Sequence, residues 1–226
     1  MQRASSWSPV ADRLGERYPP VLVEHDSYER DARMDEIDAT APEGAVVCGY
    51  SLGGRLALHS ALRSPRRYSA LVVLGASAGL EDEITRRRRR SSDERLADWI
   101  EGREIDEVVE HWEGQEVFAS QAPEIVAAQR PDRLSHDPAG LATLLRSAGQ
   151  GAMAPVWSEL HELSIPVLAV AGELDHPYAV AARRLAAEVP DGASALVPDA
   201  GHAAHIEEPE AFAALLDEFL GAKVEP

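Results

Sequence analysis

The chain has 226 residues, of which 45% are hydrophobic and 27% charged, and its formal net charge at pH 7 is −17. This length suits one domain, with or without a small insertion. The acidic balance argues against nucleic acid as a general partner, because phosphate binding requires a basic surface. No apolar run approaches the ~18 residues that a membrane span requires. With one cysteine and no apolar leader in its opening residues, the protein is expected in the cytoplasm.

Short apolar runs alternate with helical patterns through the first third of the chain. In order, the spacing predicts a helix over residues 9–18, a strand over 20–24, a helix over 32–40, a strand over 45–48, a helix over 53–62 and a strand over 70–76. The order strand, helix, strand predicts parallel pairing in an α/β sheet.

Residues 78–160 differ in character, with charged helical segments and almost no β-branched runs. The alternation then resumes with a strand over 166–173, a helix over 178–188, a strand over 194–199 and a helix over 209–220. We therefore expect an α/β core formed by residues 1–77 and 161–226, with residues 78–160 inserted as a helical cap.

The stretch "GYSLGGRLAL" places Ser51 between glycines, directly after a buried strand and before a helix. This G-x-S-x-G pattern is typical of a nucleophile elbow, a tight and strained turn that lifts the serine hydroxyl clear of the sheet. The backbone N–H of Leu52, at the start of the helix, is placed to stabilise an oxyanion. The same pattern also occurs as a plain turn, so a catalytic role depends on partner residues.

Candidate partners follow later predicted strands in the order that an α/β-hydrolase requires. Asp175 comes after the strand "PVLAVAGE", and His202 comes after "SALVPD". His202 is expected to act as the base for Ser51, with Asp175 fixing the imidazole tautomer. Asp199 and Asp191 are alternatives for the acid. His205 is the alternative histidine, as an interior or supporting residue.

These motifs resemble the α/β-hydrolase superfamily and, within it, the 2-succinyl-6-hydroxy-2,4-cyclohexadiene-1-carboxylate synthases of menaquinone biosynthesis. The resemblance runs from about Trp7 to Leu220 and includes the narrower cap segments "RRRRRSSDERLADWIE", "HWEGQEVFASQ" and "RLSHDPAGLATLLRSAGQGAMAPVWSEL", besides "GELDHPY" and "AGHAAHIEEPEAF". It implies a lyase that removes a proton and expels pyruvate from a substrate with several carboxylates. Ser51, activated by His202 and Asp175, would then serve as a base.

The resemblance also implies which side chains bind the substrate carboxylates. Arginine suits that role because its planar guanidinium binds a carboxylate at two points. The implied residues are Tyr50, Arg55, Arg89, Trp112 and Arg133. Arg86 shares one helix face with Arg89, whereas Arg87, Arg88 and Arg90 are expected in solvent; Arg130 is an alternative to Arg133, and Trp112 could instead be core.

The sequence departs from the family at its beginning. No His-Gly loop precedes Ser5, so the N-terminal strands and the second oxyanion donor are expected to be missing. Loss of one such donor costs roughly 100-fold to 1,000-fold in rate. A strand edge left open by this loss would be a hazard, and we expect residues 1–8 or a second chain to cover it.

Three functions remain in competition: the lyase, a serine esterase or thioesterase, and a non-catalytic protein of hydrolase descent. The arginines favour the lyase, because a neutral acyl substrate needs no cations. No metal-ligand spacing and no dinucleotide fingerprint stand out, so no cofactor is expected. The expected partner is a small anionic carboxylate, and the expected assembly is a monomer or a homodimer.

Overall fold

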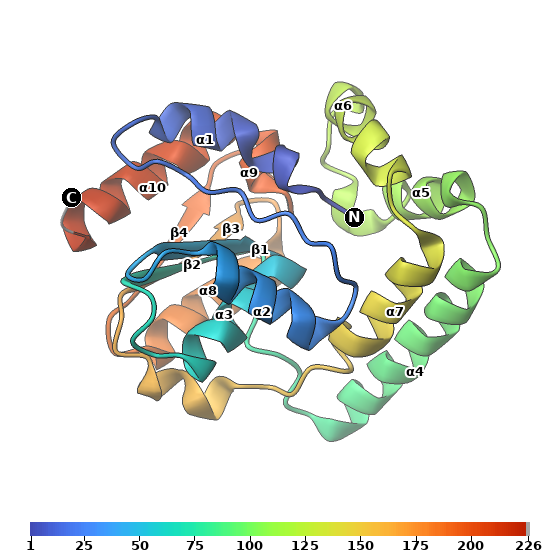
Figure 1. The fold of residues 1–226 in the computed structure, drawn as a ribbon, viewed down its shortest axis with the longest axis horizontal. Coiled ribbons are helices and arrows are strands. Elements are labelled where there is room, and N and C mark those ends of the chain that lie inside the picture. Colours follow the sequence, from blue (N-terminus) through green and yellow to red (C-terminus); the bar gives the residue numbers. More distant parts are fainter. Residues whose placement is uncertain (225–226) are drawn as a thin grey trace.

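A computed structural model describes residues 1–224 as a parallel sheet flanked by helices, with a helical arm extending from one side (Figure 1). The four strands are β1 (Val46–Tyr50), β2 (Ala70–Leu74), β3 (Val167–Gly172) and β4 (Gly192–Val197). Within the described residues they lie in the order β1-β2-β3-β4. All neighbours pair in parallel, with Cys48 opposite Val72 and Val72 opposite Leu168. The parallel α/β sheet predicted from the sequence is confirmed.

The two central strands are buried throughout their length, as expected of parallel strands covered on both faces. On one face Leu71, Val73 and Ala169 pack under α2 (Arg30–Thr40), α3 (Leu52–Arg63) and α8 (His176–Glu188). On the other face Val72 and Val170 pack under α1 (Ser8–Leu14) and α10 (Pro209–Lys223). The alternation along each strand assigns successive side chains to the two layers.

We call the helical arm, which lies between β2 and β3 in the chain, the cap. It comprises α4 (Glu83–Glu101), α5 (Ile105–Glu113), α6 (Pro123–Leu134) and α7 (Pro138–Ala148), with the short turn η2 (Glu116–Phe118) between α5 and α6. The remaining short elements are η1 (Ala4–Trp7), η3 (Trp157–Glu162) and α9 (Ala204–Glu207). Helices α4 and α7 pack along each other through a small cluster that includes Ala97, Ile100 and Leu141. No helix in residues 1–224 combines the length and apolar character that a bilayer crossing requires.

The strand predicted over residues 20–24 is wrong. This segment is extended but unpaired, and Val21 and Leu22 are 56% and 40% exposed. Pro19 and Pro20 lack the N–H groups with which a strand would begin pairing. Val23 packs against the core and Glu24 binds Arg3, so side chains and not a backbone ladder hold the segment.

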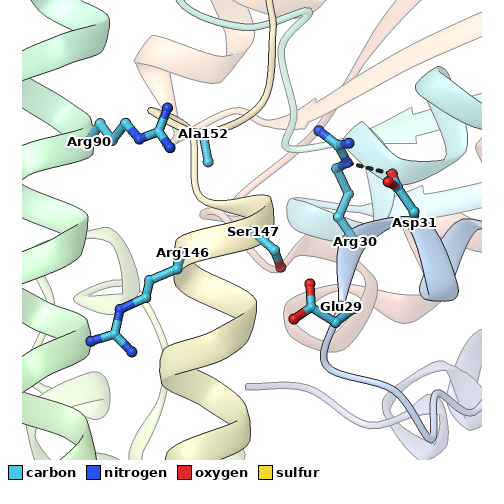
Figure 2. Close-up of a pocket in the computed structure, with 7 residues that line it drawn as sticks. All are labelled: Glu29, Arg30, Asp31, Arg90, Arg146, Ser147 and Ala152. Carbon is cyan, nitrogen blue, oxygen red and sulfur yellow. Dashed lines mark hydrogen bonds and ion pairs between the residues drawn. The ribbon is translucent and has the colours of Figure 1, made fainter.

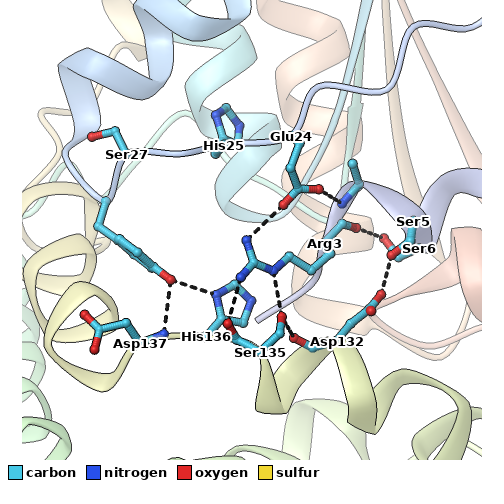
Figure 3. Close-up of polar contacts among 12 residues, drawn as sticks. Arg3, Ser5, Ser6, Glu24, His25, Ser27, Asp132, Ser135, His136 and Asp137 are labelled. Carbon is cyan, nitrogen blue, oxygen red and sulfur yellow. Dashed lines mark hydrogen bonds and ion pairs between the residues drawn. The ribbon is translucent and has the colours of Figure 1, made fainter.

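Residues 1–8 do not add a strand to β1. They form η1 and the start of α1, and β1 remains at the edge of the described sheet. Arg3 instead joins the core to the cap, since it donates to Glu24 Oε1 at 2.9 Å and to Ser135 Oγ at 3.0 Å (Figure 3). The opening residues therefore brace the cap and leave the outer edge of β1 without a strand partner among residues 1–224.

Candidate active site

Ser51 lies at the sharp turn between β1 and α3. Its φ of 50° and ψ of −110° are unusual for a residue with a side chain, and its N–H donates to the Leu74 carbonyl at 2.8 Å. The turn is tight enough that a Cβ on Gly49 would lie 2.3 Å from the Gly53 oxygen, and one on Gly54 would lie 2.9 Å from Ala76 Cβ. The glycines at 49 and 54 are thus a steric requirement of the turn that presents the hydroxyl.

The three predicted triad residues lie within hydrogen-bond distance of one another. His202 Nε2 is 3.1 Å from Ser51 Oγ, and His202 Nδ1 is 2.6 Å from Asp175 Oδ2. His202 and Asp175 are 4% and 8% exposed. Each follows the carboxyl end of a strand, Asp175 after β3 and His202 after β4, where α/β sheets build their sites.

The alternative residues for the acid lie elsewhere. Asp191 pairs with Lys223 Nζ at 2.6 Å on the surface. Asp199 has a φ of 57°, and its N–H lies 3.3 Å from Glu173 Oε2, so it serves the turn that leads to His202. Of the three aspartates, Asp175 is the one in contact with the histidine.

Leu52 is the first residue of α3. N–H groups in the first turn of a helix have no acceptor one turn earlier, so the Leu52 amide is free of the α-helical ladder and lies next to Ser51. The helix N-terminus also favours negative charge at this point. This placement is the one that an oxyanion donor requires.

Aromatic side chains enclose the His202 imidazole. The rings of Tyr50 and Tyr178 lie 5.2 and 4.7 Å from it, and the cap contributes Phe118 at 6.1 Å. Burial, reinforced by the nearby Glu207 carboxylate, raises the pKa of Tyr50 well above its ordinary value. The Tyr50 phenol therefore remains protonated at neutral pH.

His205, the alternative histidine, is fully buried behind this layer. It stacks on Trp7 at 4.4 Å, and its Nε2 lies 3.4 Å from Ser6 Oγ. Burial, with a smaller contribution from His202, lowers the pKa of His205 to about 3. A neutral imidazole in this position supports the catalytic loop from inside the core.

Two of the predicted substrate arginines, one from the core and one from the cap, lie near each other. Arg55 is 9% exposed and donates to the Ala148 carbonyl, at the end of α7, at 2.9 Å. Arg89, on α4, donates to Asp93 Oδ1 at 2.6 Å and to Gln150 Oε1 at 2.8 Å. Burial lowers the pKa of Arg55 to about 10, with a lesser effect of the Arg89 charge. Arg55 nevertheless stays charged at neutral pH.

Gln150 and Tyr178 connect these arginines to the triad, and neither is among the site residues predicted from the sequence. Gln150 Nε2 donates to Tyr178 Oη at 2.7 Å, while its oxygen accepts from Arg89. Tyr178 was detectable, because it follows Asp175 by three residues in "GELDHPY". No sequence pattern points to Gln150, since its contacts depend on the conformation of the loop after α7.

Arg133 is the most deeply buried of the predicted arginines, at 1% exposure. It donates to Glu113 Oε1 at 3.0 Å and to Gln121 Oε1 at 3.4 Å, and its Nε has no acceptor among residues 1–224. Arg130, the alternative, binds the other oxygen of Glu113, but 39% of its side chain is exposed. The buried position and the unused N–H distinguish Arg133 from Arg130.

Trp112 is half-buried, with its ring 5.5 Å from that of Phe118, which in turn faces His202. Its indole N–H has no acceptor among the described residues. The rest of the arginine run is on the surface: Arg87, Arg88 and Arg90 are exposed, and Arg86 is half-buried.

A separate pocket of about 280 Å³ lies between α2 and the cap (Figure 2). Arg30, Arg90 and Arg146 line it with Glu29 and Ser147, but no triad residue does. Arg30 pairs with Asp31, and the Arg146 guanidinium binds carboxylates of α4, which include Glu94 and Asp98. Within residues 1–224, no group of three or more His, Cys, Asp or Glu side chains is arranged to hold a metal ion.

Comparison with known proteins agrees with this geometry. Residues 3–215 match the model of the alpha/beta hydrolase family. A 2-succinyl-6-hydroxy-2,4-cyclohexadiene-1-carboxylate synthase of Serratia proteamaculans is 30% identical over 96% of this chain and 85% of its own length. A Bacillus subtilis relative, provisionally assigned the same activity, is 37% identical over 77% of this chain, and the match spans 65% of that relative.

Solved structures agree on the fold. The MenH protein of S. aureus superposes with a TM-score of 0.87 at 24% identity, over 99% of this chain and 91% of that one. A thermophilic esterase from Thermogutta terrifontis superposes with a TM-score of 0.81 at 20% identity, over 99% and 87%. The chain therefore belongs to the alpha/beta hydrolase family and, within it, to the family of the 2-succinyl-6-hydroxy-2,4-cyclohexadiene-1-carboxylate synthases.

Proposed function

We propose that this protein is the menaquinone-pathway lyase that eliminates pyruvate from a cyclohexene intermediate carrying several carboxylates. The observation that carries the proposal is the 30% identity to a synthase of this name over 96% of the chain. Ser51, His202 and Asp175 are proposed as the catalytic residues. Tyr50, Arg55, Arg89, Trp112 and Arg133 are proposed to bind the substrate.

In the proposed mechanism Ser51 acts as a base. His202 Nε2 accepts the Ser51 hydroxyl proton, and the developing alkoxide removes a proton from a ring carbon of the substrate. The electron pair left on that carbon forms a ring double bond, and the bond from the ring to the pyruvyl oxygen breaks. The three-carbon group leaves as the enolate of pyruvate, which takes up one proton at its terminal carbon and becomes pyruvate; the proton held by the His202 imidazolium balances this uptake. Asp175, at 2.6 Å from His202 Nδ1, stabilises the imidazolium formed in the first step.

Electrostatics favour an anionic substrate at this site. Burial raises the pKa of Tyr178 and of Tyr50, whose rings both lie next to His202. Against this larger effect, the charges of Arg55 and Arg89 act to lower the pKa of Tyr178, and that of Arg133 acts to lower the pKa of Tyr50. Negative charge develops on the substrate as the proton leaves, and fixed cations in a buried site stabilise it. The Nε of Arg133, which has no acceptor among residues 1–224, is the atom proposed to bind a substrate carboxylate.

The second candidate is a serine esterase or thioesterase, because the same triad suffices to attack an acyl carbonyl. The third candidate is a non-catalytic hydrolase-like protein, in which these residues would perform no reaction. We also propose action in the cytoplasm, as a monomer or a homodimer, with a small carboxylate and no nucleic acid as partner. Light scattering on the purified chain distinguishes the two assemblies.

The test of the proposed function is pyruvate release from the pyruvate-bearing cyclohexene precursor, followed by a coupled assay. We expect release by the wild type and none above background by Ser51→Ala. Ser194→Ala, on the exposed strand β4, is the matched control and should retain full activity. Cleavage of short p-nitrophenyl esters without pyruvate release would favour the esterase instead. Absence of both activities, together with no labelling of Ser51 by a fluorophosphonate, would favour the non-catalytic alternative.

A further inference from the structure

Glu207 lies five residues after His202, at the end of the short helix α9, and it is not one of the predicted site residues. Its carboxylate accepts three hydrogen bonds. The Gly201 N–H donates to Oε2 at 2.8 Å, and the Ala203 N–H donates to Oε1 at 2.9 Å. These two amides belong to the residues on either side of His202, so one carboxylate holds the backbone at both sides of the base.

The third hydrogen bond comes from the cap. Ser120 Oγ, in the loop between η2 and α6, donates to Glu207 Oε2 at 2.9 Å. The loops are in close contact at this point, since a Cβ on Gly201 would lie 1.9 Å from Ser120 Oγ. Ser120 lies between Phe118, which faces His202, and Gln121, which contacts Arg133. The position of the cap and that of the histidine loop are therefore joined through a single carboxylate.

The carboxylate also suits the site chemically. Two backbone N–H groups and one hydroxyl converge on two oxygens, which an ionised carboxylate accepts in full. A glutamine cannot, because its amide nitrogen would direct a donor at a donor on whichever side it lies. Such a mismatch in a part-buried loop displaces the backbone, and a displacement of about 1 Å at a catalytic group can cost ~100-fold in rate.

We propose that Glu207 is a positioning residue that fixes the distance between the His202 imidazole and the Ser51 hydroxyl, and that through Ser120 this distance depends on the position of the cap. This proposal rests on the proposed lyase function for its substrate. Its geometric basis, the link between Glu207 and the His202 loop, holds for any reaction of the triad.

The test compares Glu207→Gln with Glu208→Gln in the full chain. Glu208 is the adjacent residue, carries the same charge, and has no side-chain hydrogen bond to another described residue, so it is the matched control. Two rates are measured: steady-state pyruvate release, and covalent labelling of Ser51 by a fluorophosphonate, which needs the triad but no natural substrate. We expect Glu207→Gln to lower kcat and the labelling rate by about tenfold or more, with KM within twofold of the wild type.

Ser120→Ala tests the hydrogen bond between the cap and Glu207. It also provides the test of the proposal if Glu207→Gln does not fold. It should lower kcat about threefold at unchanged KM and have no further effect in the Glu207→Gln background, as expected of residues that act through one contact. If both rates in Glu207→Gln stay within twofold of Glu208→Gln, or if only the melting temperature falls, the proposal is wrong. A wild type that labels but releases no pyruvate refutes the lyase function, and the labelling ratios still decide the role of Glu207.

Discussion

The core and the cap bring their functional side chains to the site in different ways. In the core, Ser51, His202 and Asp175 contact one another directly, at 3.1 and 2.6 Å, and need no ligand to be in register. In the cap, Arg89 and Arg133 are already paired with Asp93 and Glu113. The triad is preorganised, whereas under the proposed function a substrate carboxylate would share or displace the protein carboxylates that hold Arg89 and Arg133. Changes to the triad should therefore affect kcat, and changes to Arg89 and Arg133 should affect KM.

The largest effect is expected from the acid of the triad. Asp175→Asn should lower kcat by about 10³-fold to 10⁴-fold, because an amide favours the wrong imidazole tautomer and does not stabilise the imidazolium. Asp199→Asn is the matched control, since Asp199 also follows a strand and asparagine tolerates its positive φ. Steady-state pyruvate release measures both, and equal losses in the two variants would contradict the assignment of the acid.

Next in size is the buried arginine of the cap. Arg133→Lys should raise KM by about tenfold to 100-fold with a smaller change in kcat, because lysine cannot bind a carboxylate at two points. Arg130→Lys keeps the other contact to Glu113 and should change KM less than threefold. A fall in melting temperature without a change in KM would show that Arg133 only holds the cap together.

A smaller effect is expected at Arg89, whose side chain is 43% exposed. Arg89→Gln should raise KM about threefold to tenfold, since part of its interaction is screened by solvent. Arg88→Gln, one residue away on the exposed surface of α4, is the control and should leave KM unchanged. Raising the salt concentration should increase KM in the wild type and have less effect in Arg89→Gln. Equal KM values in the two variants would exclude Arg89 from substrate binding.

The smallest expected effect is on the free energy of unfolding in acid. It involves two buried histidines, one in the core and one at the cap. Burial is the main cause that lowers the pKa of His205, in the core, and of His136, at the cap, to about 3 each. The unfolded chain, with histidine pKa near 6.5, binds more protons than the folded chain between pH 3 and 6.5. The stability that depends on keeping these histidines neutral is therefore fully present above pH 6.5 and is lost as the pH falls.

When the pH falls from 7 to 5, the free energy of unfolding should therefore decrease by up to about 2 kcal/mol for each of these two histidines. His136→Gln should remove that share of the pH dependence, whereas His176→Gln, at an exposed position, should not. Urea unfolding followed by circular dichroism at the two pH values measures the difference. An unchanged pH dependence in His136→Gln would mean that His136 is not held neutral by the fold.

Local patterns were sufficient for much of the molecule. The fully apolar runs at β2 and β3 could be predicted as buried strands because burial on both faces leaves no polar alternation. The elbow at Ser51 could be predicted because its glycines are a steric need of the turn. The prediction of a strand over 20–24 is wrong because a strand also requires a neighbouring strand to pair with, and a local pattern does not show whether one is present.

What the sequence by itself determined is the fold class and the residue types at the centre of the site, because both follow from short segments with a fixed physical requirement. Only the tertiary structure decided which arginine atoms are engaged by Asp93, Gln150 and Glu113, and that Tyr178 and Glu207 lie against the triad. Those contacts join segments far apart in the chain, and their strength depends on burial and geometry, which residue spacing does not encode.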